Sequence, residues 1–238
     1  MLKISTFILG MVQTNVYLIA DSETGDTVII DPAWDDQDIL DTAQKQKWKI
    51  NQIWITHAHF DHFAGVDVVA NSSFPAIPVC LHPDDLDLWR EGGGAHIFNI
   101  DIKRASDPNI HLRDREILSV GKYFFEVRHI PGHSSGHVVF YCFSEKLMFC
   151  GDVIFRGSIG RTDLPGGNFD TLINGIQKHI LTLSDDVLLL PGHGSETSVG
   201  RERKSNPYQY LRQLRTSGRL KYWVNSAQTG NLLKNVSQ

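Results

Sequence analysis

The stretch Thr56-His57-Ala58-His59-Phe60-Asp61-His62 holds three imidazoles and one carboxylate within six positions. Histidine and aspartate are costly to bury unless another charge pairs with them. The cluster follows Ile53-Trp54-Ile55, an apolar run typical of a buried strand, so it needs a partner of high positive charge. A divalent metal ion is the simplest such partner. The alternative is a polar cluster on the surface with no ion.

The spacing inside this cluster favours two ions over one. His57 and His59 lie two positions apart, as they would on one side of an extended segment. Asp61 and His62 can turn toward a second point. One ion cannot easily use all four side chains, whereas two neighbouring ions can share them. Such a pair can clamp a substrate and generate a hydroxide between the metals.

Composition and charge exclude some classes of function. The 238 residues carry a net charge of -4, which argues against nucleic-acid binding because no basic excess could release counterions from a phosphate backbone. No run of 18 apolar residues occurs, and the first ten residues lack the basic start of a signal peptide, so we expect a cytoplasmic protein with no membrane segment. Cys80, Cys142 and Cys150 lie in apolar runs without a CxxC pair, which indicates buried, reduced thiols.

Apolar patterning predicts an α/β order of elements around the cluster. Strands are expected at residues 2–9, 14–21, 27–31, 52–56, 79–82, 122–128, 138–143, 146–150 and 187–190. Helices are expected at residues 36–46, 65–71, 83–90, 168–183 and 208–214. Residues 91–109 show no period and are expected to form a loop. In an α/β order, functional residues gather at the carboxyl ends of strands.

Further candidate ligands follow other predicted strands. Gly132-His133 lies after the strand at 122–128, Gly151-Asp152 ends the strand at 146–150, and Gly192-His193 follows the strand at 187–190. Asp31 also ends a strand, where it either supports a site or forms a turn or helix cap. His137 is a candidate to support the ligands from behind. Each of these signals is weak alone.

These four ligand motifs, in this order, resemble the metallo-β-lactamase-fold hydrolases over residues 2–207. The segment at residues 157–167, with Glu202-Arg203 and Asn206-Pro207, resembles the compact glyoxalase II-like, or hydroxyacylglutathione hydrolase-like, branch. The resemblance implies an α/β (α+β) fold, the four-layer αββα sandwich. It further implies a single domain at residues 1–215, followed by a tail at 216–238 of unknown role.

The resemblance also assigns the ligands. His57, His59 and His133 would hold one metal, Asp61, His62 and His193 the other, and Asp152 would bridge the two. Asp61 and Asp152 would therefore be catalytic carboxylates as well as ligands. Imidazole and carboxylate suit zinc, the expected ion, and also iron or manganese. The absence of cysteine from the ligand set argues against a purely structural zinc site.

The implied activity is hydrolysis of a small-molecule thioester derived from glutathione. Two cations would lower the pKa of a bridging water, and the hydroxide would attack the thioester carbonyl. Arg161 stands where the family carries a basic residue for a glutathione carboxylate. Ser195 stands where larger glyoxalase II enzymes have a tyrosine that holds glutathione, so recognition of glutathione stays open.

Three alternatives compete with this interpretation. A persulfide dioxygenase of the same fold uses one iron on two histidines and an aspartate, and it shares the Gly160-Arg161-Thr162-Asp163 segment, although the following Leu164-Pro165-Gly166-Gly167 favours the hydrolase. A β-lactamase has a similar histidine cluster but not the segment at 157–163. A non-catalytic binding protein on this fold would not need all seven ligands. The sequence leaves open the metal, the acyl group and the oligomeric state.

Overall fold

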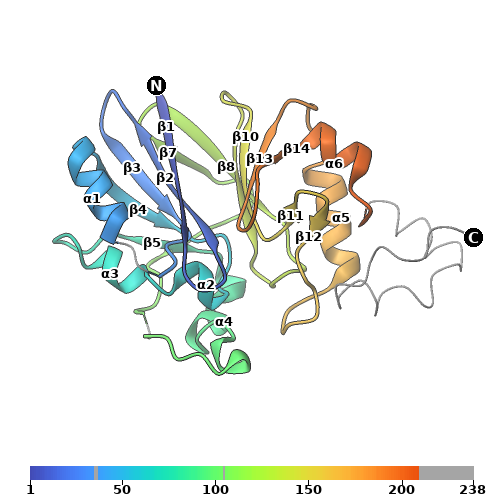
Figure 1. The fold of residues 1–238 in the computed structure, drawn as a ribbon, viewed down its shortest axis with the longest axis horizontal. Helices are drawn as coiled ribbons and strands as arrows, with labels where there is room; N and C mark the ends of the chain where they lie inside the picture. Colours follow the sequence, from blue (N-terminus) through green and yellow to red (C-terminus); the bar gives the residue numbers. More distant parts are fainter. Residues whose placement is uncertain (35–36, 104, 209–238) are drawn as a thin grey trace, which may run out of the picture.

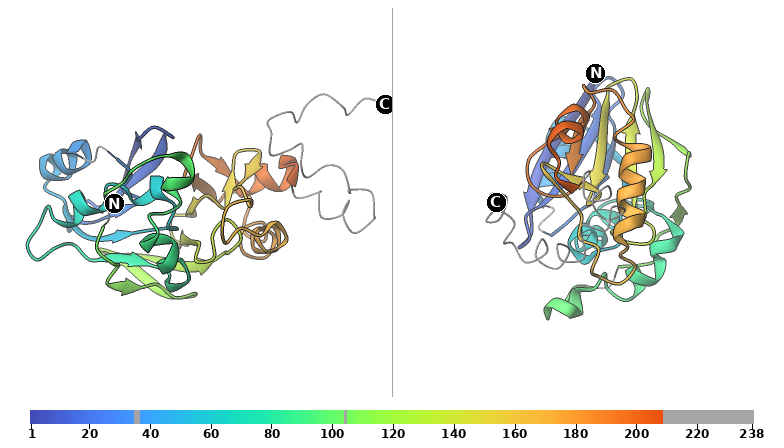
Figure 2. Two further views of the ribbon diagram at one scale, coloured as in Figure 1. Left: turned by 90° about the horizontal axis from the view of Figure 1, so that it is seen from below. Right: turned by 90° about the vertical axis from the view of Figure 1, so that its right-hand side faces the viewer.

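Two six-stranded β-sheets face each other in the middle of the molecule, and helices cover their outer faces (Figures 1 and 2). The computed structural model describes residues 1–34, 37–103 and 105–208. This arrangement confirms the predicted αββα sandwich. None of the described helices has both the length and the apolar character needed to cross a membrane.

The first sheet is antiparallel at one edge and parallel at the other. Its β1–β2 and β2–β3 pairs are antiparallel, and the three pairs from β3 to β6 are parallel. In spatial order its strands are β1 (Leu2–Leu9), β2 (Thr14–Asp21), β3 (Asp26–Ile30), β4 (Lys49–Trp54), β5 (Val79–Leu81) and β6 (Ile110–His111).

The second sheet contains one parallel pair, β10 with β13, among antiparallel pairs. In spatial order its strands are β14 (Thr197–Ser198), β13 (Leu188–Pro191), β10 (Leu147–Gly151), β9 (Val138–Cys142), β8 (Tyr123–His129) and β7 (Ile117–Val120). A small hairpin of β11 (Ile154–Phe155) and β12 (Ser158–Ile159) stands apart from both sheets.

The helices lie outside the sheets, with α1 and α3 against the first and α5 and α6 against the second (Figure 1). Their bounds are α1 (Gln37–Gln46), α2 (Phe60–Phe63), α3 (Val66–Ala70), α4 (Leu86–Arg90), α5 (Phe169–His179) and α6 (Val199–Ser205), with 3₁₀ turns η1 (Pro83–Asp85) and η2 (Ala95–Phe98). Asn168 begins α5 as predicted, because its side-chain oxygen accepts a hydrogen bond from the Thr171 backbone N–H at 2.9 Å.

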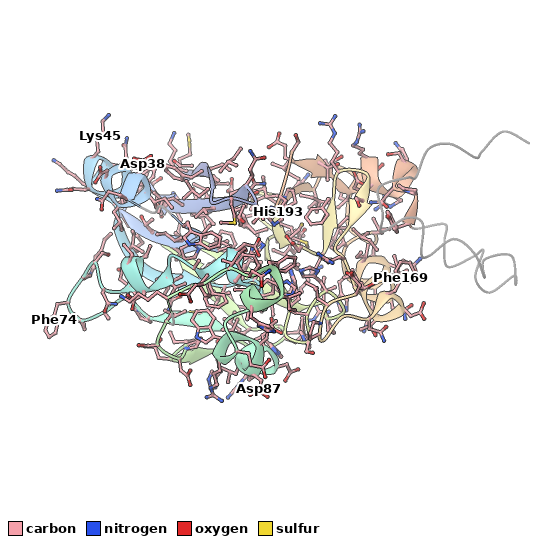
Figure 3. All side chains as sticks on the ribbon, turned by 60° about the horizontal axis from the view of Figure 1, so that its bottom comes forward. Asp38, Lys45, Phe74, Asp87, Phe169 and His193 are labelled. Atoms are coloured by element: carbon pink, nitrogen blue, oxygen red, sulfur yellow. The ribbon has the colours of Figure 1, made fainter. Side chains whose placement is uncertain are left out.

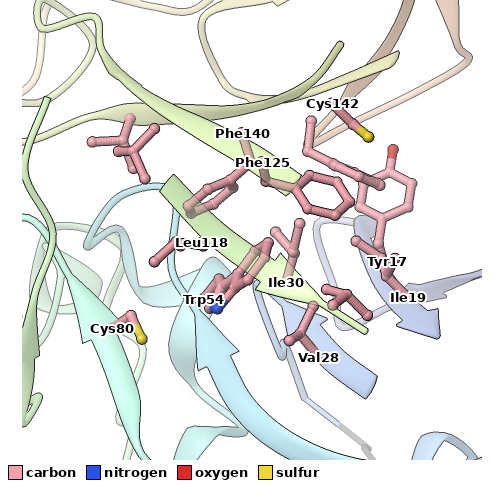
Figure 4. Close-up of a cluster of buried hydrophobic side chains, with 14 of the residues drawn as sticks. Tyr17, Ile19, Val28, Ile30, Trp54, Cys80, Leu118, Phe125, Phe140 and Cys142 are labelled. Atoms are coloured by element: carbon pink, nitrogen blue, oxygen red, sulfur yellow. The ribbon is translucent and has the colours of Figure 1, made fainter. Parts of the chain in front are cut away.

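Strand β2 shows why the sequence produces layers. Every residue of β2 is buried, so neither face of this strand meets water. Tyr17 and Ile19 point into the core between the sheets, whereas Val16 and Leu18 pack under the helices of the first sheet. Figure 4 shows the inner core, in which Trp54 meets rings from the opposite sheet, including Phe125 at 5.3 Å between ring centres.

Several short elements were not predicted from the sequence. The patterning did not show β6, β7, β11, β12, β14 or α6, and η2 lies inside the segment expected to be a loop. The helix α5 ends at His179, four residues before the predicted end. Apart from Tyr208, the helix expected at 208–214 lies outside the described residues, as does the tail at 216–238.

Candidate metal centre

All seven predicted ligands lie together at one edge of the sandwich. The cluster from His57 to His62 follows β4 and opens α2, and His133 lies on the loop between β8 and β9. Asp152 and His193 follow β10 and β13, which are parallel neighbours, so their carboxyl ends meet at this edge. Figure 3 shows His193 near the middle of this face of the molecule.

Three ring nitrogens converge at the first position. The Nε2 atom of His133 lies 3.1 Å from Nε2 of His57 and 2.8 Å from Nδ1 of His59. Ligands at about 2.1 Å from a tetrahedral zinc ion lie roughly 3.4 Å apart, so this spacing is close to that of a three-histidine site. All three side chains are buried.

The second position combines carboxylate oxygens with imidazoles. The Oδ2 atom of Asp61 lies 3.4 Å from Nε2 of His62 and 3.2 Å from Nε2 of His193. Asp152 reaches both positions, because its Oδ1 lies 3.5 Å from Nε2 of His62 and its Oδ2 lies 3.6 Å from Nε2 of His133. These distances give Asp152 the place that a bridging carboxylate requires.

Hydrogen bonds set the tautomers of four histidines. The Nδ1–H of His133 donates to the Arg161 carbonyl at 2.8 Å, and that of His193 donates to the Gln13 carbonyl at 3.3 Å. His62 donates from Nδ1 to Asp31 at 3.0 Å, and Nδ1 of His57 contacts the Thr56 hydroxyl at 3.0 Å.

In its neutral form, with Nδ1 carrying the proton, each of these four rings directs the Nε2 lone pair into the cluster. At the first position, the Nε2 lone pairs of His57 and His133 then face each other across 3.1 Å, a contact that a cation between them would relieve. At the second position, His62 Nε2 and Asp152 Oδ1 are buried without a hydrogen-bond partner. Buried polar atoms are rarely left unpaired, so these residues fit divalent cations. The donors are imidazole and carboxylate only, which suits zinc, iron and manganese alike.

The side chains of the two positions differ in the charge that they carry without metal. Burial lowers the pKa of His59 to about 3 and that of His133 to about 4. Burial also disfavours the charged form of His62, but Asp61, Asp152 and Asp31 raise its pKa to about 10. Burial would raise the pKa of Asp61, yet His62 and His193 hold it well below its usual range. Without metal, the first position is therefore neutral and the second contains an ion pair.

These pKa values predict a stability maximum near pH 6.5 for the metal-free protein. Below pH 6.5, His59 and His133 become protonated in the unfolded chain but stay neutral in the folded protein. The free energy of unfolding therefore falls by about 1.4 kcal/mol per pH unit for each histidine. Above pH 6.5 folded His62 keeps a proton that the unfolded chain loses, so stability falls again toward pH 10. Denaturant unfolding of chelator-treated protein at pH 5, 6.5 and 8 measures this. A steady rise in stability up to pH 8 would contradict it.

Two residues outside the predicted ligand set support it through hydrogen bonds. Asp31 contacts His62 of the second position, and His137 contacts the backbone of Asp152. Asp31 accepts hydrogen bonds from the backbone N–H and the hydroxyl of Thr56, both at 2.7 Å, as well as from His62. His137 accepts a hydrogen bond at Nε2 from the backbone N–H of Asp152 at 3.0 Å. Asp31 therefore supports the site, and His137 has the supporting position expected for it.

Asp85 joins the two loops that deliver the first position. Its carboxylate is fully buried and accepts hydrogen bonds from the Ala58 N–H at 2.9 Å, the Ser134 hydroxyl at 2.7 Å and the Gly136 N–H at 2.6 Å. Ala58 lies between His57 and His59, and Ser134 follows His133. Burial raises the pKa of Asp85, while these donors oppose the rise. Sequence analysis missed this residue because it lies in a helical segment that looks solvated.

Replacing Asp85 with alanine should loosen the first position. Three buried donors would lose their acceptor, so we expect the free energy of unfolding to fall by about 3 kcal/mol. Loss of such an outer support typically costs about 10- to 100-fold in metal affinity. Chelator competition measures the affinity and denaturant unfolding of the metal-free protein measures the stability. Wild-type affinity in the folded Asp85→Ala protein would show that Asp85 does not position the ligands.

Glycine allows close approach at Gly192. A Cβ atom there would lie 2.3 Å from Asp152 Oδ1 and 2.7 Å from Cε1 of His62. A larger residue would push the Asp152 carboxylate out of place. The glycine of the Gly-His motif after β13 is therefore a packing requirement of the site.

Arg161 does not reach the cluster with its side chain. Its guanidinium donates to both carboxylate oxygens of Asp163, at 2.7 and 2.8 Å, and is about half exposed. The part of Arg161 that contacts the site is its backbone carbonyl, which orients His133. A substrate carboxylate bound by this arginine would have to share it with Asp163 or displace Asp163.

Comparison with known proteins fits this geometry. The family model described as Metallo-beta-lactamase superfamily matches residues 9–193, which include all seven clustered side chains. The chain belongs to this superfamily. Membership in the metallo-beta-lactamase superfamily supports a metal-dependent hydrolase, and its fold implies divalent metal ions.

Several relatives match nearly their whole length. Hydroxyacylglutathione hydrolase GloC of Haemophilus influenzae is 34% identical over 204 residues, covering 82% of this chain and 92% of the relative. The crystal structure of BLEG-1 B3 metallo-beta-lactamase has a TM-score of 0.81 at 34% identity and covers 88% of this chain and 99% of its own. The structure of TTHA1623 in a di-iron-bound form has a TM-score of 0.78 at 35% identity, with 86% and 99% covered.

Proposed function

We propose that this protein is a dinuclear metal-dependent thioesterase of the hydroxyacylglutathione hydrolase type. The observation that carries the proposal is the pair of donor sets joined by Asp152, whose carboxylate oxygens lie 3.5 Å from His62 Nε2 and 3.6 Å from His133 Nε2. The similarity to GloC, a hydroxyacylglutathione hydrolase by name, supports the thioester substrate.

The chain's own residues would hold the ions and leave the reacting space polar. His57, His59 and His133 would hold the first ion, Asp61, His62 and His193 the second, and Asp152 both. When bound, two divalent cations supply a hydroxide near neutral pH and stabilise negative charge on an acyl oxygen. Asp61 and Asp152 keep the second position anionic, and the lowered pKa of Asp61 keeps it a carboxylate at neutral pH.

No thiol near the site competes for the role of nucleophile. Cys150, two residues before Asp152, is fully buried, and burial raises the pKa of its thiol. Ser134 uses its hydroxyl to donate to Asp85. A water-derived nucleophile is consistent with both facts, because neither side chain can be activated where it lies.

A substrate panel with metal analysis tests the proposal. We expect two metal ions per chain and hydrolysis of S-lactoylglutathione at a kcat/KM well above that for a lactone or a chromogenic cephalosporin. Oxygen uptake with glutathione persulfide, together with one iron per chain, would instead identify a dioxygenase. Chelator-treated protein is the control for metal dependence. Preferred turnover of the cephalosporin would overturn the thioesterase assignment.

A further inference from the structure

The small hairpin of β11 and β12 connects two supports of the metal centre. Asp152 comes two residues before β11, and Arg161, whose carbonyl accepts the hydrogen bond from His133, comes two residues after β12. The base of the hairpin is closed by a hydrogen bond from the Gly160 N–H to the Val153 carbonyl at 3.3 Å. A shift of the hairpin would therefore reach both Asp152 and the acceptor that orients His133.

The hairpin also lies directly against the predicted ligands. A Cβ atom on Gly160 would clash with the Asp152 carbonyl oxygen and would lie 3.0 Å from Nδ1 of His133, so the backbone at this glycine packs against both residues. The Phe155 ring lies edge-on to the ring of His193, with 6.3 Å between the ring centres. Three of the seven predicted ligands therefore depend on where this hairpin lies.

Neither sheet holds the hairpin in place. Among the residues that the structure describes, its two strands pair only with each other, and an isolated two-stranded hairpin is only marginally stable in water. Ile154 and Ile159 pack on the apolar side chains of α5. Apolar packing is not directional, so it does not fix where the turn of the hairpin points. The turn needs hydrogen bonds from outside the hairpin.

Glu202, a fully buried residue of α6, supplies such a bond (Figure 1). Its Oε2 atom accepts a hydrogen bond at 2.9 Å from the N–H of Gly157, which lies in the turn of the hairpin. Its Oε1 atom accepts one at 2.6 Å from the hydroxyl of Thr197 on β14. A carboxylate is costly to bury unless its charge is compensated, and these donors compensate it together with Arg201, whose Nε lies 3.8 Å from Oε1.

Asn206 adds a second bond to the same turn. Its buried side-chain amide donates to the Ser158 carbonyl at 3.0 Å and to Oε2 of Glu202 at 2.8 Å. Gly157 and Ser158 are neighbours, so one end of α6 holds both sides of the turn. Glu202 and Asn206 belong to the sequence motifs noted after residue 200, and the predicted ligand set leaves both without a role.

We infer that Glu202, assisted by Asn206, is a positioning residue of the metal centre and acts through the β11–β12 hairpin. It keeps the Asp152 carboxylate and the Arg161 carbonyl in place by fixing the turn between them. Without Glu202 the turn loses its link to α6, and the hairpin can move together with both supports. The inference rests on the dinuclear centre of the proposed function and is independent of which thioester is the substrate.

Zinc affinity tests the inference. Glu202→Ala leaves the Gly157 N–H without its acceptor, so we expect zinc affinity, measured by chelator competition on the full-length protein, to fall by about 10- to 100-fold. In Glu202→Gln the side-chain oxygen can accept from Gly157 while its NH₂ group donates to the Thr197 hydroxyl, so zinc affinity should equal that of the wild type. Wild-type affinity in folded Glu202→Ala would overturn the inference. An equally large loss in Glu202→Gln would overturn it too.

Thr197→Val is the matched control for stability. It removes one hydrogen bond from the same carboxylate but leaves both bonds to the hairpin turn. Denaturant unfolding of the zinc-free protein should show a lower free energy of unfolding, because a buried acceptor loses its donor, whereas zinc affinity should stay unchanged. If Thr197→Val and Glu202→Ala lost zinc affinity equally, affinity would follow stability and not the place of the hairpin, and the inference would fail.

Asn206→Ala keeps the test decisive if Glu202→Ala does not fold. It removes the bond to Ser158 but leaves Glu202 bonded to Gly157 and Thr197, so we expect zinc affinity to fall by about tenfold. Amide hydrogen exchange in the zinc-free variant should be faster than in the wild type across residues 153–161 and unchanged in β9. Wild-type exchange across residues 153–161 would contradict a link between α6 and the hairpin.

These measurements separate the inference from the proposed function, because zinc binding and hydrogen exchange need no substrate. If the variants respond as stated but the wild type hydrolyses no thioester, the thioesterase assignment fails and the inference stands. If Glu202→Ala binds zinc as the wild type does and S-lactoylglutathione is hydrolysed, the inference fails and the thioesterase stands. A wild-type protein that binds no zinc would overturn both.

Discussion

Asp152→Ala is expected to lose bound metal and thioester hydrolysis together, with kcat/KM falling by about 1,000-fold or more. The reason is position: of the carboxylates in the described part of the chain, only Asp152 lies within 3.6 Å of ring nitrogens from both donor sets. If Asp152 holds both ions as proposed, its loss would leave their mutual repulsion without an offsetting anion. Metal content by elemental analysis and hydrolysis of S-lactoylglutathione measure the two losses.

Controls distinguish this result from unfolding. Asp87→Ala removes a carboxylate that is 97% exposed and should leave metal content and turnover unchanged. Thermal unfolding of both variants without metal should show that Asp152→Ala still folds, because Asp31 and Asp61 remain to pair with His62. A folded Asp152→Ala protein that retains two ions and full activity would refute the bridging role.

The outline of the fold could be predicted because its long elements carry clear patterns. The first two strands match β1 and β2 at both ends, and Asn168 marks the start of α5. Elements of two residues, such as β11 and β14, contain too few positions to show alternation. Their existence depends on partners brought together by the tertiary structure.

The convergence of the seven predicted ligands could be anticipated from the sequence, whereas most of the residues that support them could not. Ligands are recognisable by residue type and by position after a strand, and all seven converge. Asp85 supports the site by accepting hydrogen bonds from Ala58 and Ser134, which are 27 and 49 residues away in the sequence. No local pattern encodes such a contact. Asp31 was visible only as a carboxylate at a strand tip, a place that also suits a turn.

Asp31→Asn should weaken metal binding at the second position while the first position keeps its ion. Asp31 orients His62 by accepting a hydrogen bond from its Nδ1–H at 3.0 Å. The Nε2 lone pair is then directed at the second position. In Asp31→Asn, the amide oxygen can still accept from the Thr56 N–H, but the NH₂ group would then face His62 Nδ1. His62 would shift its proton to Nε2, the atom needed for the metal.

Asparagine is also the right substitution for the backbone. Asp31 has a φ of 53°, which asparagine tolerates and alanine does not, so Asp31→Asn isolates the effect on His62 from backbone strain. We expect affinity for the second ion to fall by about 100-fold and affinity for the first by much less. Stepwise metal titration with a chelating indicator resolves the two affinities, and Asp26→Asn, which changes a partly buried carboxylate of β3 that accepts a hydrogen bond from Asn51, is the control. If Asp31→Asn binds both ions as the wild type does, Asp31 does not set the protonation of His62.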